Sequence, residues 1–535
     1  MSPFTQVLMP FEETNGFEKL IIDYLNDSKF LLQFYQFDDT LQGIQSRIET
    51  YQNNRLNREN LKEVLLKQYI SYGIDEIPQK VHKNILSLVH PDTFTVTSGH
   101  QLNIFSGPLY VIYKLISTIN LAEKLNTHFP DKHFVPVYWM ATEDHDINEI
   151  TSINLFGKNY KWESQWKGIA GKMPLNGIEA VISELKLIFG NSVFGDELIS
   201  IMTTSYLDST LLSEATRKWI NKLLGKSGLV VIDGNDASFK KTIHDILSDE
   251  LINKTSSTII NKTTQNLGKK YQSQANPREI NLFYIGDDFR ERLVIENDGI
   301  KVLNTDIFFS MDRIKEELIS NPEKFSPNVV LRPLYQESIL PNVVFVGGPS
   351  EISYWLELKD LFEYHNVPLP VLFLRCSSMI LDKNMLNKLD KLSIKEKDTF
   401  LTVDELIKTF IHTKEKDQPT FHNVIKVISD EFIRLSNSVS TVDPTLRAAV
   451  ESESIKVLAS LHLLEDKIMR SLKKKNETEI NQIRKIKGKL FPSGKFQERE
   501  DSMISFYLNW GSEFIESLKK NLDPLQKEFI ILKEL

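Results

Sequence analysis

Five short apolar runs, each ending in small or polar residues, constrain the fold of this 535-residue chain more than any other feature. The runs begin at Thr93, Phe134, Gly228, Asn342 and Leu369. Because they are continuously apolar rather than alternating, they predict strands buried on both faces, as in a parallel sheet covered by helices. The sequence therefore predicts a doubly wound α/β core, in which ligands bind outside the carboxyl ends of the strands.

The length and charge of the chain limit its organisation and its partners. A chain of 535 residues exceeds what one hydrophobic core usually supports, so we expect two or three structural units. The net charge of −8 offers no basic footprint for nucleic acid. The single cysteine, Cys376, rules out an intrachain disulfide and a cysteine-based zinc site, which fits a reducing compartment. No signal peptide or membrane-spanning run is visible, so we predict a cytoplasmic protein without a membrane or nucleic-acid partner.

The segments around the five runs predict helices, two insertions and an arm. Apolar residues at helical spacing over 16–90 predict helices that cover the sheet. Further helices are expected at 176–190 and 197–224, and a hairpin at 281–296, where Gly-Asp-Asp has turn chemistry. The expected organisation is a core over 1–380 with insertions at about 151–226 and 240–341, a helical arm over 381–501, and a C-terminal helix over 502–535.

The arm contains a coiled-coil pattern. Val450, Val457, Leu461, Leu464 and Ile468 fall at alternating three- and four-residue steps if Ser454 occupies one seam position. This spacing predicts a homodimer contact. The alternative interpretation is a long helix that folds back on its own domain, since only about two clean heptads are visible.

The first candidate site follows the first strand. The strand is expected to end at Thr97 and to enter a turn at Ser98-Gly-His-Gln101, so His100 lies where the strand passes into a helix, with Gly99 before it and Ser106 after it. Backbone N–H groups at such a turn hold phosphate, and an imidazole there could hydrogen-bond a phosphoryl oxygen. The alternative is a histidine with a structural role in the turn.

The second candidate site follows the second strand. Glu143-Asp-His-Asp146 places three carboxylates and an imidazole within four residues. These groups could orient an amine, act as a general base or hold Mg²⁺. The alternative is a helix N-terminus whose acidic residues complement the helix dipole, but a dipole does not call for a histidine.

The third candidate site is Gly347-Gly-Pro-Ser-Glu351, after the fourth strand. Its glycines could let a ligand approach the backbone, and Tyr354 adds aromatic surface. The alternative is a tight strand-to-helix turn with Ser350 as the N-cap.

Together these stretches resemble the bacillithiol-biosynthesis family BshC, whose motifs match at 98–110, 136–146, 281–284, 347–351 and 490–499. The resemblance implies a Rossmann-like core similar to class I aminoacyl-tRNA synthetases, with inserted connecting-peptide subdomains and an α-helical coiled-coil arm that dimerises. It implies a ligase that joins cysteine to glucosaminyl-malate through an amide bond. Many members carry Gly-Gln-Gln-x-Gly where this chain has Gly99-His-Gln-Leu-Asn103. Asn at the last position is compatible with a left-handed backbone, whereas His100 departs from the family's glutamine.

The resemblance and the motifs together lead to expected roles. A carboxylate is a poor electrophile, so activation of cysteine by a nucleotide is expected, with ATP and Mg²⁺ as the candidate. His100 and Gln101 would hold phosphoryl or carboxyl oxygens, and Glu143, Asp144 and His145 would orient or deprotonate the amine. The residues expected to bind substrate or nucleotide are Ser98, Gly99, Asn103, Asp146, Gly347, Gly348, Ser350, Glu351 and Tyr354. No protein metal site is predicted. Two alternatives stay open: a similar ligase with another amino acid or amine, and a non-catalytic coiled-coil scaffold that senses a nucleotide.

Overall fold

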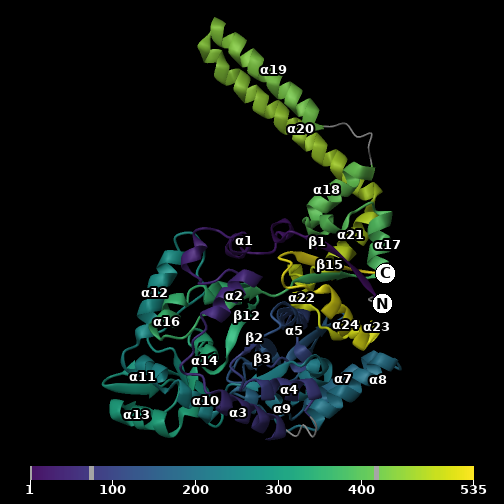
Figure 1. Ribbon diagram of the computed structural model, residues 1–535. Helices are drawn as coiled ribbons and strands as arrows, with labels where there is room; N and C mark the ends of the chain where they lie inside the picture. Colours follow the sequence, from purple (N-terminus) through teal and green to yellow (C-terminus); the bar gives the residue numbers. More distant parts are fainter. Residues whose placement is uncertain (1–2, 72–76, 415–420) are drawn as a thin grey trace. The chain divides into compact units, whose positions relative to one another are not determined.

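The computed structural model describes residues 3–71, 77–414 and 421–535 (Figure 1). It divides into two compact units, Met1–Ile380 with Lys495–Leu535, and Leu381–Gly494. Residues 495–501, which we expected in the arm, belong to the first unit.

The first unit is built on a five-stranded parallel sheet. Its strands are β13 (Val371–Leu374), β12 (Asn342–Gly347), β2 (Thr93–His100), β3 (His133–Met140) and β6 (Val230–Asp233), in that spatial order. These are the five apolar runs of the sequence. Numbered along the chain, the order is 5-4-1-2-3, the strand order of a Rossmann fold, and it reverses between β2 and β12. The predicted doubly wound core is therefore confirmed.

Helices pack against the strands of this sheet. The long helix α5 (Leu109–His128) packs on β2 and β3, and α2 (Leu41–Glu49) packs on β12. The helix α1 (Lys19–Leu25) reaches β13, where the Tyr24 hydroxyl donates to the Leu372 carbonyl at 2.7 Å. The helical cover predicted from residues 16–90 is thus present.

The chain after β2 differs from the turn that we expected at Ser98. Ser98 and Gly99 continue β2, where they pair with Tyr138 and Trp139 of β3. The turn comes later, where Phe105, Ser106 and Gly107 take φ angles of 50°, 72° and 57° before α5. Asn103 has a φ of −58°, so it does not adopt the left-handed conformation with which asparagine is compatible.

The first insertion begins with an antiparallel pair of strands, β4 (Ser152–Leu155) and β5 (Lys158–Lys161), continues as helices, and is part of the main core. It contains α7 (Ile178–Phe189), α8 (Val193–Met202), a π-helical turn (Thr203–Leu207) and α9 (Leu212–Leu224). The single helix expected at 197–224 is therefore broken. Trp162 and Trp219 are buried in the same cluster as residues of α5.

The second insertion carries an antiparallel sheet. Its strands are β10 (Phe308–Ser310), β9 (Gly299–Val302), β8 (Arg290–Glu296), β7 (Leu282–Ile285) and β11 (Phe325–Pro327), in that spatial order. The predicted hairpin is β7–β8, and Gly286 donates its backbone N–H to the Phe289 carbonyl at the turn.

The C-terminal segment is two helices and a strand, not the single helix that we expected. The elements are α23 (Ile504–Trp510), α24 (Ser512–Asn521) and β15 (Phe529–Glu534). Gly511, with a φ of 57°, separates the two helices. β15 pairs with β1 (Phe4–Met9) along its length, so the two ends of the chain lie side by side (Figure 1).

The second unit is helical. Its helices are α17 (Lys383–Lys391), α18 (Val403–Lys414), α19 (Phe421–Val442), α20 (Arg447–Lys475) and α21 (Glu477–Leu490). α19 and α20 lie along each other as a helical hairpin (Figure 1). The half-buried positions of α20 include Val450, Ser454, Leu458, Leu461 and Ile468. Val457 and Leu464, which we expected in the seam, are 37% and 47% exposed. No described helix of either unit is long and apolar enough to cross a membrane.

Candidate active site

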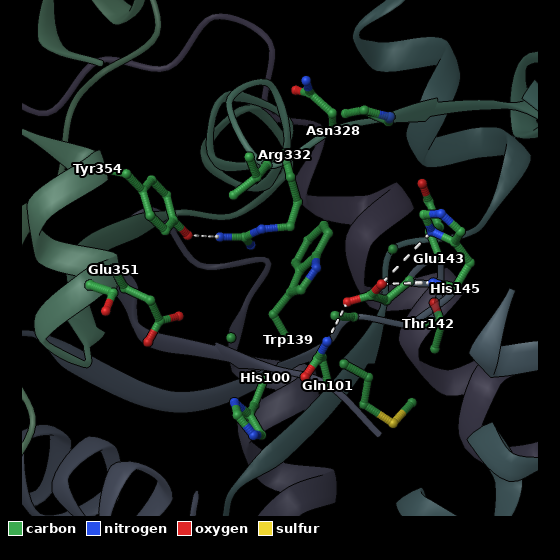
Figure 2. Close-up of a pocket in the computed structure, with 18 of the residues that line it drawn as sticks. His100, Gln101, Trp139, Thr142, Glu143, His145, Asn328, Arg332, Glu351 and Tyr354 are labelled. Carbon is green, nitrogen blue, oxygen red and sulfur yellow. Dashed lines mark hydrogen bonds and ion pairs between the residues drawn. The ribbon is translucent and has the colours of Figure 1, made fainter. Parts of the chain in front are cut away.

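A cavity of about 1010 Å³ opens at the carboxyl ends of β2, β3 and β12, beside the point where the strand order reverses. The structure brings together on it His100, Gln101, Glu143, Asp144, His145 and Glu351, as well as Gly99, Gly348, Ser350 and Tyr354. Figure 2 shows Glu351 and Tyr354 on one side and Glu143 and His145 on the other, with Trp139 between them.

Four residues expected to bind substrate do not line the cavity. Ser98 is buried within β2, and Gly347 is buried at the end of β12, where a Cβ would lie 2.8 Å from the Phe345 ring. Asn103 donates to the Glu149 carbonyl at 3.1 Å and so holds the turn. Asp146 is exposed and donates its backbone N–H to Asp144 Oδ1 at 3.2 Å.

Glu143 is fixed by two donors from the second insertion. Its Oε1 lies 2.7 Å from Nζ of Lys240, a fully buried lysine on α10 (Ala237–Thr242). Its Oε2 accepts from the Ser326 hydroxyl at 2.5 Å. Burial lowers the pKa of Lys240, and the adjacent Glu143 carboxylate opposes this effect. Because both oxygens already accept from the protein, Glu143 anchors the cavity wall.

Gln101 presents a different group from the one we expected. Its amide nitrogen donates to Asp144 Oδ2 at 2.7 Å and to Glu149 Oε2 at 3.0 Å. Asp144 Oδ1 in turn accepts the His145 N–H at 2.7 Å, so the acidic motif also caps the backbone before α6 (Ile147–Ile150). Within the described chain, the side-chain oxygen Oε1 of Gln101 has no hydrogen-bond partner, so it is the group left for a ligand.

His100 is neutral at physiological pH. Burial and the charges of Lys114 and Arg375 lower its pKa well below 6.5. Its ring lies edge-on to Tyr110, with 5.4 Å between the ring centroids. It therefore cannot hold a phosphoryl group as a cation, although a neutral imidazole still offers one N–H donor.

Glu351 links its own helix to α5 and to the turn that follows β12. It accepts from Lys114 of α5 and from the Gly348 N–H at 2.8 Å. Lys114, which is only 2% exposed, also donates to the Gly99 carbonyl at 2.9 Å. The N-cap of α15 (Pro349–Trp355) is Gly348 and not Ser350, and the Gly348 N–H is already engaged. The glycine turn is therefore a rigid strand-to-helix connection that borders the cavity.

The C-terminal segment supplies part of the wall. Glu498 forms a buried two-pronged ion pair with Arg375, at 2.7 and 3.1 Å. The neighbouring Arg499 lines the cavity, as does Arg375. Glu498 and Arg499, at the end of the motif 490–499, thus contribute to the site although they lie far from the other site residues in the sequence.

Arg290 is held by Ser326, His145 and Pro327. Besides it, four arginines line the cavity without an ion-pair partner in the part of the chain that the structure describes, and we call them the unpaired arginines: Arg278, Arg292, Arg332 and Arg499. Arg332 donates to Gln336 at 2.8 Å and to the Tyr354 hydroxyl at 3.3 Å, as Figure 2 shows for Tyr354. Of the four acidic side chains of the lining, Glu143 and Glu351 pair with lysines, whereas Asp144 and Glu149 accept from the neutral Gln101 amide, so the unpaired arginines outnumber the carboxylates without a lysine partner. The cavity therefore has uncompensated positive charge and suits an anionic ligand.

The acidic motif does not form a metal site of its own. Among the described residues, no three His, Cys, Asp or Glu side chains are grouped so that they could hold a metal ion. The option that Glu143-Asp-His-Asp146 alone coordinates Mg²⁺ is therefore not supported.

Family models match the two parts of the chain. The model described as the bacillithiol biosynthesis BshC N-terminal Rossmann-like domain matches residues 6–376, and that of the BshC C-terminal coiled-coil domain matches residues 378–534. The chain belongs to the BshC family. The resemblance inferred from the motifs is confirmed, and so are the Rossmann-like core and the coiled-coil domain.

Curated BshC relatives match nearly end to end. A protein of Flavobacterium psychrophilum is 37% identical over 98% of both chains, and one of Flavobacterium johnsoniae is 38% identical over 97% of this chain and 98% of its own. A protein of Cytophaga hutchinsonii is 36% identical over 98% of both. All three bear the name "Putative cysteine ligase BshC". The likeness of the core to class I synthetases stays a prediction.

Sequence reasoning missed several cavity residues of this BshC member. Arg290 and Arg332 line the cavity, and Lys240 and Ser326 lie behind its wall against Glu143. All four lie in the second insertion, and although Arg290 falls in the predicted hairpin at 281–296, none was expected at the site. Arg499 falls in a family motif, 490–499, but nothing in its local pattern indicated a cavity. Only the register of the antiparallel sheet brings Arg290 and Ser326 to the second candidate site.

Proposed function

We propose that this protein joins cysteine to glucosaminyl-malate through an amide bond, in the biosynthesis of bacillithiol. Support comes from its membership of the BshC family along nearly the whole chain and from relatives that bear the name of a cysteine ligase. The site is at the edge of a Rossmann-type sheet where ligands bind.

The unpaired arginines are the observation that carries this proposal. Glucosaminyl-malate has two carboxylates and cysteine has one, so both substrates offer anionic groups to the arginines of the cavity. Guanidinium groups match carboxylates and phosphates with paired N–H donors. A cavity of about 1010 Å³ lies at the upper end of the usual range for small-molecule sites, so it has room for more than one substrate.

The reaction requires an activated carboxyl group, and we propose ATP as the activator. The cysteine carboxylate would take an adenylyl group from ATP with release of pyrophosphate, or a phosphoryl group with release of ADP, and the amine nitrogen would then attack the carbonyl carbon. An amide forms, the neutral amine gives up one of its two protons, and AMP or phosphate leaves. The arginines that would pair with substrate carboxylates are equally suited to bind the phosphates of ATP.

The test begins with cells that lack this protein. They should accumulate glucosaminyl-malate and lose bacillithiol, as measured by thiol labelling and mass spectrometry, and the intact gene should restore bacillithiol. Purified protein with glucosaminyl-malate, cysteine and ATP should form the same product. Unchanged thiol pools would contradict the proposal. If the purified protein formed an amide only with another amino acid or another amine, it would be a different ligase.

Variants of the unpaired arginines sharpen this test. Arg292→Gln and Arg499→Gln should each lower product formation about ten-fold or more, because each removes a charge-assisted contact worth about 1.5–3 kcal/mol. Arg313→Gln on α13 (Met311–Ser320) is the matched control, because Arg313 is 66% exposed and is not part of the cavity lining. Equal activity of all three variants would remove the unpaired arginines from the substrate site.

A further inference from the structure

Arg290 and His145 make a contact that fixes the chemistry of the histidine. Arg290 Nη1 lies 2.9 Å from His145 Nδ1. The guanidinium itself is held by Ser326 Oγ at 2.9 Å, by the Pro327 carbonyl at 3.1 Å, and by the Phe283 ring, whose centroid is 3.8 Å away. Three separate contacts thus prevent Arg290 from turning away.

A guanidinium has only N–H donors, so the nitrogen that it contacts must accept. His145 Nδ1 is therefore unprotonated, and the proton of the neutral imidazole is on Nε2. Turning the ring over would place a carbon atom against the Arg290 N–H and lose this hydrogen bond. Nε2 has no hydrogen-bond partner in the described chain, and His145 lines the cavity, so its N–H is available to a ligand.

The charged groups around His145 keep it in this form. Burial and Arg290 lower its pKa, and the carboxylates of Asp144, Asp146 and Glu291 oppose them. The closest carboxylate oxygen, Asp144 Oδ1, is 3.9 Å from Nδ1, beyond hydrogen-bond distance, so the 2.9 Å contact with Arg290 decides the tautomer.

We propose that His145 acts as a hydrogen-bond donor through Nε2–H, not as a general base, and that Arg290 is the positioning residue that fixes this role. The only lone pair that could take a proton is on Nδ1, and Arg290 occupies it. Resting on the proposed function, the acceptor is the carbonyl oxygen of the activated cysteine, on which negative charge develops during attack by the amine.

Glu143 contributes to this arrangement indirectly, through Ser326. Ser326 Oγ donates to Glu143 Oε2 and accepts from Arg290 Nε, so Lys240, Glu143, Ser326, Arg290 and His145 form one continuous chain of contacts. This series of contacts gives Glu143 a role although both of its oxygens are occupied. Through Ser326, Glu143 orients Arg290, and Arg290 orients His145.

The tautomer can be measured without catalysis. In the full-length protein labelled with ¹⁵N-histidine, the His145 signals are identified by their loss in His145→Gln. We expect NMR to show a protonated Nε2 and an unprotonated Nδ1 from about pH 7 to 8, because burial and Arg290 lower the histidine pKa from its usual value of about 6.5. Arg290→Gln should raise the midpoint toward the usual value. A protonated Nδ1, or a wild-type midpoint at or above the usual value, would overturn the proposal.

Two matched substitutions test the role in the reaction. The amide N–H of glutamine falls near the position of Nε2–H, and that of asparagine near Nδ1. His145→Gln should therefore form bacillithiol at least ten-fold faster than His145→Asn or His145→Ala, which lose the donor at a cost of about 10²–10³ in rate. A general base predicts equal losses for glutamine and asparagine, and that result would overturn the donor role. If even the wild type forms no bacillithiol while NMR shows Nε2–H, the proposed function fails and the tautomer stands.

Discussion

Hydrogen-bond direction, more than residue type, sets what each cavity side chain can offer. Gln101 and His145 were both expected from the sequence, but Gln101 has its donors occupied and presents an acceptor, whereas His145 has its acceptor occupied and presents a donor. Residue identity at a strand end therefore predicts where chemistry occurs. It does not predict which proton is available, because that depends on partners such as Asp144 and Arg290 from other elements.

Glu337 leads to a prediction about pH and stability. This residue of α14 (Arg332–Ile339) is 2% exposed and accepts from the Gln336 and Asn342 amides. Burial raises its pKa from 4.5 to about 7. Because the folded pKa lies above the unfolded one, the folded state favours the neutral acid, and stability is lost as the pH rises through about 7.

Glu337→Gln should remove this pH dependence. Glutamine keeps an oxygen acceptor but has no charge to bury, so the variant should be more stable than the wild type at pH 8, by an amount of the order of 3 kcal/mol for such a shift. At pH 4 the two proteins should melt at similar temperatures. Calorimetry across this pH range is the measurement, and a stability difference that does not change with pH would contradict the expectation.

At the scale of elements, the buried Arg375–Glu498 pair holds the C-terminal segment against the end of β13. Arg375 and Glu498 are 2% and 1% exposed, and Glu498 also accepts the Ser378 N–H at 3.2 Å. Removing one partner of a buried pair leaves an uncompensated charge, so Glu498→Ala should destabilise the protein by about 3–5 kcal/mol. Chemical denaturation should show this loss.

The same segment contains its own control. Lys495 pairs with Glu500 at 2.7 Å but is 62% exposed, and exposed pairs contribute about 0–1 kcal/mol. Lys495→Ala should therefore leave the denaturation midpoint almost unchanged. Equal effects of the two substitutions would mean that the buried pair does not anchor the segment.

Elements differ in how far the sequence predicts them. The five parallel strands were predictable because burial on both faces leaves a continuous apolar run. The break before α9 was not, because the Glu214 carboxylate caps the Thr210 and Leu211 N–H groups without a glycine or proline to mark the end. β15 was expected as helix, since its strand character depends on pairing with β1 at the other end of the chain.

The candidate site shows the same limit. Glu143 and His145 were found because they follow a strand that the sequence marks clearly. Arg290 and Ser326 were missed because they come from β8 and β11, and their approach depends on the register of a sheet in which β7 separates them. Charge contributed by an inserted segment has no local signal in the sequence.

At the scale of the whole molecule, overall charge and cavity charge have opposite signs. The chain carries a net charge of −8, yet its cavity contains the four unpaired arginines. A cleft lined by one sign of charge concentrates ligands of the other sign, and salt screens this attraction. The negative net charge of the chain therefore argued against a nucleic-acid partner, but it did not predict the positive charge of the cavity.

The arm leads to a prediction about assembly that separates two apolar surfaces of α20. Leu461 is half-buried, whereas Val457 and Leu464 are 37% and 47% exposed, on a hairpin that already packs its own two helices together. We expect the exposed pair to contact a second copy of the chain. Val457→Glu with Leu464→Glu should convert a dimer into a folded monomer in sedimentation experiments, because burying unpaired carboxylates costs several kcal/mol.

Leu461→Glu tests the other surface of the same helix. A carboxylate at this half-buried position should disturb packing between α19 and α20, so the arm should melt at a lower temperature whether or not the protein dimerises. The double variant at Val457 and Leu464 should instead change mass at micromolar concentration with little change in melting temperature. If the wild type sediments as a monomer, the exposed pair has no partner copy. If all the substitutions lower the melting temperature alike, Val457 and Leu464 support the fold of the arm and not its assembly.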